Sequence, residues 1–527
     1  MPRSFTPALT LLLVLLGLWS PGIASAAPGA LPWGPPTPLL RGTSQFPYAF
    51  GDLLHRGADG SMLVTVRTSR GVVTAARSSR GRFGVPRLLQ TGPTLATDDL
   101  RPQPIVAAGG RSLLLWQPDA GGSSVAGAVI DPVAEPRRLQ LPPMQLDQLT
   151  SVALDGSGEV TIVAGEFGDP LQVVSGRADD RPLGVQSLAT ADEGASLGSV
   201  ASSRHGAVVA WRARVPCPDP TLNGCAEVRA AVRPAGAATF GPASTLDAVA
   251  WAGAGAVLSA PQVHAVRDRL IVTWRTDDPR TGVHAVRVAV VAGTGFLPAR
   301  SVPGTEPNTI VEPAGTTACG SSGSGPTTMT PGENPVAAGL VPRQGGGSLL
   351  FLRRQDSSCG AALELSSLTD AGEPSAPRPL VGLRSRVDES PRLEPGHDGH
   401  TLIVGREDHD LTFARLDTDD AAAARPVTVR DAEYVASGWD GRAAIVVAEV
   451  PCGPRMRRTD AWVLTDSGTR RAHVWPCQRT QPPMELDGAG HLVLVGRERR
   501  NLFVARASCR LATWVARPRA GCRAPRA

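Results

Sequence analysis

The chain has 527 residues, a formal net charge of +5 and no lysine, so every fixed positive charge is carried by arginine. The absence of lysine excludes a Walker-type phosphate-binding loop, a pyridoxal Schiff base and a protein kinase, because each depends on a lysine side chain. A charge this small on so long a chain does not predict nucleic-acid binding.

Residues 1–26 have the three-part organisation of a secretory signal peptide. Arg3 gives a positive start, an apolar run extends from Ala8 to Trp19, and Ala24–Ala26 provides small residues for cleavage. A membrane-spanning helix needs about 20 apolar residues, more than this run provides. We expect cleavage near Ala26 and a secreted, extracellular or cell-envelope protein with no membrane span. An uncleaved anchor is the alternative.

Residues 48–507 repeat a unit of four short apolar strands. The unit has a turn after its first strand that often holds Asp-Gly, a second strand that often ends in Trp-Arg, and a last strand led by Phe-Gly or Pro. It is clearest in Tyr48–Leu89, Ser199–Leu246 and Pro261–Pro303. Short alternating strands between abundant glycines and prolines predict antiparallel meanders.

Weaker copies of this unit make about nine repeats in all. They start near Pro104, Ser151, Pro335, Ser390, Tyr434 and Pro483. Four strands in roughly 45–55 residues are typical of a propeller blade. We therefore predict an all-β fold, a single β-propeller of four-stranded antiparallel blades with seven to nine blades. Residues 304–332, rich in Thr, Gly, Ser and Pro, are expected to form a flexible insertion.

Residues 27–47 contain what looks like the last strand of a blade without the three strands before it. Trp33–Leu40 reads WGPPTPLL, which is similar to the FGVPRLL of Phe83–Leu89. We predict that Trp33–Leu40 pairs beside the strands near His491–Val495 and Asn501–Arg506. This pairing would close the ring and remove exposed strand edges.

Residues 508–527 are locally basic. The arginines without acidic neighbours are Arg510, Arg517, Arg519, Arg523 and Arg526. We expect a solvated C-terminal tail, with contact to an anionic surface as the alternative.

All eight cysteines follow the predicted signal peptide, and an exported protein meets oxidising conditions. Proximity along the chain predicts the pairs Cys217–Cys225, Cys319–Cys359, Cys452–Cys477 and Cys509–Cys522. Other connectivities stay open, because spacing alone does not fix them. No CxxC pair occurs, which argues against a zinc site.

The repeats resemble those of secreted β-propeller proteins of high-GC bacteria, as in VRAAVRPAGAATFGPASTL over 228–246. The resemblance covers nearly the whole mature chain and implies a fold, not an activity. Such repeats are distantly similar to sialidase-like propellers, whose Asp-x-Gly-x-Thr-Trp boxes do not occur here. The Asp-Gly pairs that begin at Asp59, Asp155, Asp398, Asp440 and Asp487 are expected to be ordinary hairpin turns.

A tryptophan recurs at the end of the second strand, at Trp116, Trp211 and Trp274. Large aromatic side chains on apolar strands usually bury their area, so we expect wedges between neighbouring blades. A stack of sugar-binding rings is the alternative.

The chain offers few candidates for catalysis. A sialidase-like enzyme needs a tyrosine nucleophile and a carboxylate base, and Tyr48 and Tyr434 are the two tyrosines. Glu433 cannot serve Tyr434, because neighbours on a strand point to opposite faces. A carboxylate from elsewhere in the chain remains open.

The densest group of histidines and acids surrounds the strand Thr401–Gly405. Its members are His397, Asp398, His400, Glu407, Asp408, His409 and Asp410. The strand would separate the two halves by roughly 17 Å, too far for one ion. We interpret them as two polar turns and predict no metal site there.

An acidic residue precedes the first strand of nearly every repeat. Our candidate ligand-binding residues are Asp98, Asp147, Asp192, Glu333, Asp388 and Asp431, with Asp99, Glu193, Asp247 and Glu389 close to them. In a propeller these links lead to the innermost strand, so the carboxylates would gather at one end of the central channel and favour a bound cation. Calcium suits carboxylate oxygens best, and a basic peptide or amine is the other option. The alternative is that Asp simply favours turns.

The sequence therefore predicts a secreted, monomeric, non-enzymatic binding or scaffold propeller without a required cofactor. Its ligand would be an extracellular glycan or protein. The alternative function is a carbohydrate-active hydrolase or lyase of the sialidase-like propeller type.

Overall fold

The computed structural model describes residues 31–516 with gaps, of which the longest are 41–53, 90–102 and 305–335. Shorter gaps lie between strands. The predicted signal peptide and most of the insertion 304–332 lie outside the described residues.

The strands of the described residues form nine antiparallel sheets, in which strands consecutive in the chain are mostly neighbours. The first sheet contains β2 (Leu54–Arg56), β3 (Met62–Thr68), β4 (Gly71–Arg77) and β5 (Arg87–Leu88); the second contains β6 (Gln103–Val106), β7 (Ser112–Trp116), β8 (Ala126–Ile130) and β9 (Arg137–Leu139); the third contains β10 (Leu149–Leu154), β11 (Glu159–Ala164), β12 (Leu171–Arg177) and β13 (Gly184–Ala189).

The middle three sheets follow a short 3-10 helix, η2 (Ala191–Glu193). The fourth sheet contains β14 (Ser196–Ser203), β15 (Gly206–Val215), β16 (Gly224–Pro234) and β17 (Ser244–Trp251); the fifth contains β18 (Val257–Leu258), β19 (Gln262–Val266), β20 (Arg269–Asp278), β21 (Val283–Ala292), β22 (Gly295–Phe296) and β23 (Arg300–Ser301); the sixth contains β24 (Val336–Arg343), β25 (Gly346–Arg354), β26 (Gly360–Leu368) and β27 (Arg378–Arg386). The fifth sheet thus adds two short strands to the predicted four.

The last three sheets precede a short helix, α2 (Leu511–Ala516). The seventh sheet contains β28 (Arg392–Pro395), β29 (Thr401–Glu407), β30 (Asp410–Leu416) and β31 (Val427–Val429); the eighth contains β32 (Glu433–Asp440), β33 (Ala443–Gly453), β34 (Met456–Thr465) and β35 (Gly468–Gln478); the ninth contains β36 (Met484–Leu486), β37 (Leu492–Glu498), β38 (Asn501–Arg506) and β1 (Thr37–Leu40).

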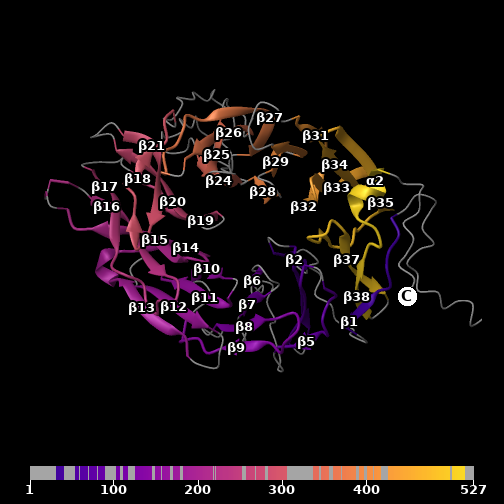
Figure 1. Cartoon of the computed structure of the whole chain (residues 1–527), viewed down its shortest axis with the longest axis horizontal. Coiled ribbons are helices and arrows are strands. Elements are labelled where there is room, and N and C mark those ends of the chain that lie inside the picture. Colours follow the sequence, from indigo (N-terminus) through magenta and orange to yellow (C-terminus); the bar gives the residue numbers. More distant parts are fainter. Residues whose placement is uncertain are drawn as a thin grey trace, which may run out of the picture.

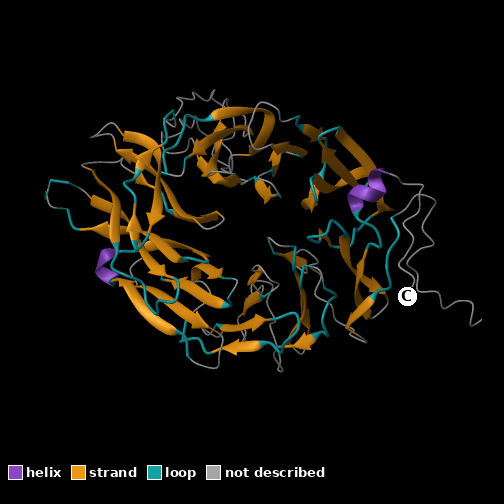
Figure 2. Cartoon of the chain, viewed as in Figure 1, coloured by secondary structure: helices purple, strands orange, loops and turns teal. Residues whose placement is uncertain are grey.

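The sheets are arranged as a ring, with the first strand innermost in each sheet except the fifth, where β19 takes this place (Figure 1). Inner strands of neighbouring sheets contact one another, as β10 does with β14 and β14 with β19, and β2 contacts both β6 and β36. The two helices of the described residues lie at the outer rim (Figure 2). The predicted β-propeller is confirmed, whereas the number of its blades stays a prediction.

The ring is closed by a strand from the start of the chain. In the ninth sheet β1 pairs antiparallel with β38, so that Thr37 lies opposite Val504 and Pro38 opposite Phe503. Trp33 forms a further bridge to Ala507. The N-terminal segment therefore supplies the fourth strand that the last repeat lacks, as its sequence predicted.

The three recurring tryptophans are wedges between sheets. Trp116 packs with Leu63 and Ala76 of the first sheet, and its side chain is 2% exposed. Trp211 packs on the third sheet and Trp274 on the fourth. Because these rings are buried, they cannot form an accessible sugar-binding stack.

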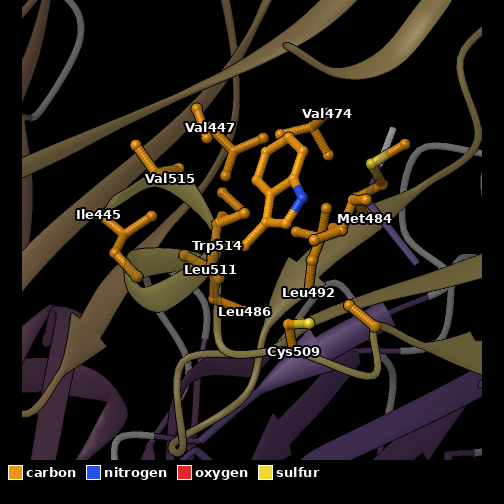
Figure 3. Close-up of a cluster of buried hydrophobic side chains, with 14 of the residues drawn as sticks. Ile445, Val447, Val474, Met484, Leu486, Leu492, Cys509, Leu511, Trp514 and Val515 are labelled. Carbon is orange, nitrogen blue, oxygen red and sulfur yellow. The ribbon is translucent and has the colours of Figure 1, made fainter. Parts of the chain in front are cut away.

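Part of the segment predicted as a basic tail is a buried helix. Leu511, Trp514 and Val515 of α2 pack between the eighth and ninth sheets, against residues that include Val447 and Leu492 (Figure 3). The prediction of a solvated tail over residues 508–527 is therefore wrong for the part up to Ala516, because three apolar side chains of this part are buried in the core. Residues 517–527 lie outside the described part.

Two of the predicted disulfides are present, Cys217–Cys225 and Cys452–Cys477. Cys509 is disulfide-bonded as well. Its predicted partner Cys522 and the pair Cys319–Cys359 lie outside the described residues, so these two pairings stay predictions.

The closed ring is held by a buried carboxylate in the turn between β36 and β37. Asp487 is 0% exposed and accepts hydrogen bonds from Arg77 of the first sheet at 2.9 Å and from Arg506 of β38 at 2.7 Å. Its other oxygen accepts from the backbone N–H groups of Ala489 and His491. Asp487 therefore does more than form the ordinary hairpin turn that we expected, because it links the last sheet to the first.

Burial alone would raise the pKa of Asp487, but the hydrogen bonds from His491 and the charges of Arg77 and Arg506 hold it well below its usual range. A carboxyl with a lowered pKa in the folded state stabilises the fold above its unfolded pKa, about pH 4, and loses that contribution as the pH falls through its folded pKa.

We predict that Asp487→Asn lowers the free energy of unfolding at pH 7 by about 3–5 kcal/mol, because it leaves the buried guanidinium of Arg77 without its counter-charge. Denaturant unfolding followed by circular dichroism measures this loss. The matched control is Glu135→Gln, which breaks the exposed pair of Glu135 with Arg87 and should cost less than about 1 kcal/mol. Equal losses in the two variants would contradict a closing role for Asp487.

Candidate functional site

Four of the six residues of the predicted acidic ring lie outside the described residues: Asp98, Asp147, Glu333 and Asp388. Of the six candidates, Asp192 lies exposed in η2 and Asp431 lies exposed in the turn before β32. The ring and its calcium therefore stay a prediction.

Two acidic residues near that ring are engaged in contacts between elements. Glu193 pairs with Arg229 of β16 at 2.6 Å. Asp247 of β17 accepts hydrogen bonds from Trp274 at 2.8 Å and from Arg287 of the fifth sheet at 2.8 Å. These two carboxylates have structural partners, so their recurrence in the sequence has a physical reason other than a ligand.

The described members of the histidine and acid group lie at opposite ends of β29. His400 precedes this strand and stacks on Trp439 with the ring centroids 6.2 Å apart, whereas Glu407 ends it. No group of three His, Cys, Asp or Glu side chains in the described residues could hold a metal ion. His397, Asp398 and Asp408 lie outside these residues.

The inner strands of four sheets bring together a different set of polar side chains, which we call the axial cluster. Its members are Arg56 of β2, Arg392 and Glu394 of β28, Tyr434 and Ser437 of β32, and Glu485 of β36. They come from the first, seventh, eighth and ninth sheets, on both sides of the ring closure. Sequence reasoning missed this cluster because its members are far apart in the chain.

Hydrogen bonds and charge connect these residues across the sheets. Arg56 donates to the backbone oxygen of Ser437 and lies 3.6 Å from the carboxylate of Glu394. The hydroxyl of Ser437 donates to Glu394 at 3.2 Å, and it lies 3.0 Å from the hydroxyl of Tyr434. Arg56 thus reaches past the ninth sheet to join the seventh and eighth.

Burial changes the ionisation of the axial cluster. It raises the pKa of Glu394, and it raises the pKa of Glu485 to about 7 against the opposing charge of Arg56. Burial and the charge of Glu485 raise the pKa of Tyr434 to about 12. Perturbed titratable groups that converge from several elements are typical of binding sites.

Arg392 is the exposed member of the cluster. Its guanidinium lies over the ring of Tyr434, 4.1 Å from the centroid. Among the described residues no carboxylate forms an ion pair with it. A guanidinium over an aromatic ring can still donate from its N–H groups to a carboxylate or another planar anion.

The arrangement around Tyr434 does not activate its hydroxyl. That hydroxyl bonds to Ser437, a neutral side chain, and its pKa is raised. A tyrosine nucleophile needs a base in hydrogen-bond reach and a lowered pKa. The cluster is thus better suited to holding a ligand than to attacking one.

No model of a known protein family matches the sequence, and no curated protein matches it. Solved structures with a similar architecture include a prolyl endopeptidase (13% identity, 81% of this chain and 55% of that chain, TM-score 0.39). A puromycin-hydrolyzing peptidase of Mycobacterium tuberculosis gives 14% identity over 88% of this chain and 60% of that chain, with a TM-score of 0.36. The β-propeller domain of the Trilobed protease from Pyrococcus furiosus gives 9% identity over 72% of this chain and 96% of that chain, with a TM-score of 0.33.

The chain spans 55% of the prolyl endopeptidase and 61% of a puromycin hydrolase. All of these TM-scores lie below 0.5, so we draw no argument from them about activity. Within the described residues, no helix has the length and apolar character that crossing a membrane requires.

The raised pKa of Glu485 gives a testable pH dependence. Between about pH 4.5 and 7 the folded state holds a proton that the unfolded state has released, so the stability should fall as the pH rises through this range. We predict that Glu485→Gln removes this fall and makes the protein more stable at pH 8, by no more than about 3 kcal/mol. Thermal unfolding at several pH values measures it.

The control for this experiment is Glu433→Gln, which changes an exposed glutamate of the same inner region paired with Arg457. It should leave the pH profile as in the wild type. A wild-type stability that does not change between pH 5 and 8 would contradict burial of an ionisable Glu485.

Proposed function

We propose that this chain is an exported, non-enzymatic β-propeller that binds an extracellular ligand, a glycan or a protein, through the axial cluster. The observation that carries the proposal is the exposed guanidinium of Arg392 stacked on Tyr434. It lies beside partly buried polar groups that come from four sheets. A few convergent polar groups on a rigid scaffold are what a binding site needs for orientation and specificity.

The charges of the cluster suggest the chemistry of the ligand. Arg56 has Glu394 and the backbone of Ser437 as hydrogen-bond or ion-pair partners. Arg392 lies over the ring of Tyr434, and its charge lowers the pKa of Glu394 and Glu485 without an ion pair to either. Glu485, with a pKa of about 7, is partly neutral at physiological pH. The surplus positive charge therefore favours a ligand that presents a carboxylate.

Export is supported by the leader-like sequence of residues 1–26 and by the two disulfides of the described residues. The alternative function, a hydrolase or lyase acting on glycans, would use Tyr434 with Glu394 or Glu485 nearby. The hydrogen bond from Tyr434 to Ser437 and its raised pKa favour binding over this chemistry.

The test is a glycan array and a peptide array probed with the mature protein, beside an activity screen on glycosides and polysaccharides. We expect binding of acidic ligands without turnover. Arg392→Gln should weaken the binding by about tenfold or more, since a charge-assisted hydrogen bond is lost. Arg300→Gln, which removes an exposed arginine from β23, is the matched control and should bind as the wild type does.

Turnover of a glycoside that is abolished by Tyr434→Phe would replace this proposal with the hydrolase. If a ligand is found and Arg392→Gln binds it as the wild type does, the axial cluster is not the binding site.

A further inference from the structure

A second charged group lies at the outer edge of the eighth sheet, on β34 and β35. Its centre is the carboxylate of Asp460, which is 0% exposed. Arg471 donates two hydrogen bonds to it, one of them at 2.9 Å from Nε. His473 lies 2.6 Å from its other oxygen, and Arg458 lies 3.4 Å away. We call Arg458, Arg471 and His473 the cation triad.

The cation triad carries more positive charge than its buried carboxylate can balance. Asp460 offers one negative charge, whereas two arginines are permanently charged and His473 adds a third charge when protonated. The side chains of Arg458, Arg471 and His473 are 34%, 44% and 66% exposed. Their remaining N–H groups therefore face solvent beside a surplus of charge.

The geometry of the triad is fixed before any ligand arrives. Arg471 lies over the ring of Trp462, 5.0 Å from its centroid, while its fork is held by Asp460. Trp462 itself is buried against Phe413 of the seventh sheet. A preorganised cation loses less conformational entropy on binding than a free surface arginine.

The surroundings of the triad extend its positive charge. Arg455, directly before β34, and Arg479, directly after β35, are exposed, and the acidic side chains Glu433 and Asp466 are paired with other arginines. The helix α2 contacts β34 and β35, and Arg470 donates to the backbone oxygen of Ala516.

We propose that this edge is a binding site for an anionic polysaccharide, with the cation triad holding a sulfate or carboxylate group of the polymer. Guanidinium groups that share one face with an imidazole suit the oxygens of such a group. A repeating polyanion can also engage the other arginines along the edge, with an affinity that falls as salt rises.

The apolar surface argues against a lipid bilayer as the partner. The large hydrophobic side chains exposed in the described residues are Val85, Leu88, Val133, Val185 and Val381, and none belongs to the eighth sheet. A protein that binds the membrane surface usually inserts apolar groups beside its basic ones. The eighth sheet presents the charge without them.

This site is separate from the axial cluster, because β35 is the outermost strand of its sheet and β32 the innermost. Its test does not depend on the proposed function. The mature protein is titrated with heparin as a sulfated probe, polygalacturonate as a carboxylated probe and neutral dextran, by calorimetry at low and physiological salt. We expect binding of at least one polyanion and none of dextran.

The double variant Arg458→Gln/Arg471→Gln should weaken polyanion binding by about tenfold or more, the loss expected for two charge-assisted contacts. The matched control is Arg300→Gln/Arg378→Gln, which removes the same charge from exposed positions on the outer strands β23 and β27. It should change the affinity by less than about twofold, as expected for exposed charges distant from the site. An equal loss of polyanion affinity in the two double variants would show that only the net charge matters, and it would overturn the proposal.

The double variant removes two partners of the buried carboxylate of Asp460 and could therefore destabilise the fold. A second measurement for this reason uses the unaltered protein. Arginine modification by phenylglyoxal, mapped by mass spectrometry, should show Arg458 and Arg471 protected by the polyanion and Arg300 and Arg378 unprotected. Protection confined to Arg300 and Arg378 would overturn the proposal. Binding to phosphatidylglycerol vesicles without binding to either polyanion would overturn it as well.

Discussion

The pairing of β1 with β38 is the contact on which the rest of the structure depends. Without β1 the outer edge of β38 would expose unpaired backbone groups. The last sheet would also lose the strand that comes from the same end of the chain as the first sheet. The buried carboxylate of Asp487, shared by Arg77 and Arg506, strengthens the same junction. The ring is thus closed by two contacts, the backbone pairing of β1 with β38 and the buried ion pair of Arg77 with Asp487. Each contact needs residues from both ends of the chain.

Packing between sheets follows one repeated plan. Each recurring tryptophan fills the space against the preceding sheet, and arginines at the ends of third strands do the same with charge. Arg77 reaches Asp487 and lies over Phe83, while Arg233 reaches Glu159 of the third sheet and lies over Phe240. A buried arginine with both an acid and a ring has its charge and its stem satisfied. The repeats are thus joined by the same contacts that make them look alike.

The two candidate sites differ from these packing contacts because some of their arginines stay exposed. In the axial cluster Arg56 crosses from the first sheet to the seventh and eighth, and Arg392 keeps an exposed guanidinium over Tyr434. At the outer edge Asp460 gathers more cations than it balances. Both sites present positive charge, and they lie at different positions in the ring, one on inner strands and the other on outer strands of the eighth sheet.

The repeats, the alternating strands and the blade-like look of Trp33–Leu40 were sufficient to predict a propeller closed by its N-terminal strand, since strand period, turn residues and repeat length are local properties. The wedge role of Trp116 and the pair Cys452–Cys477 also followed from local pattern. The axial cluster and the partners of Asp487 did not, because they join residues that are hundreds of positions apart, such as Arg77 and Asp487. Local sequence determines which strands form, but only the closed ring decides which charges meet, because that depends on how the sheets pack around the axis.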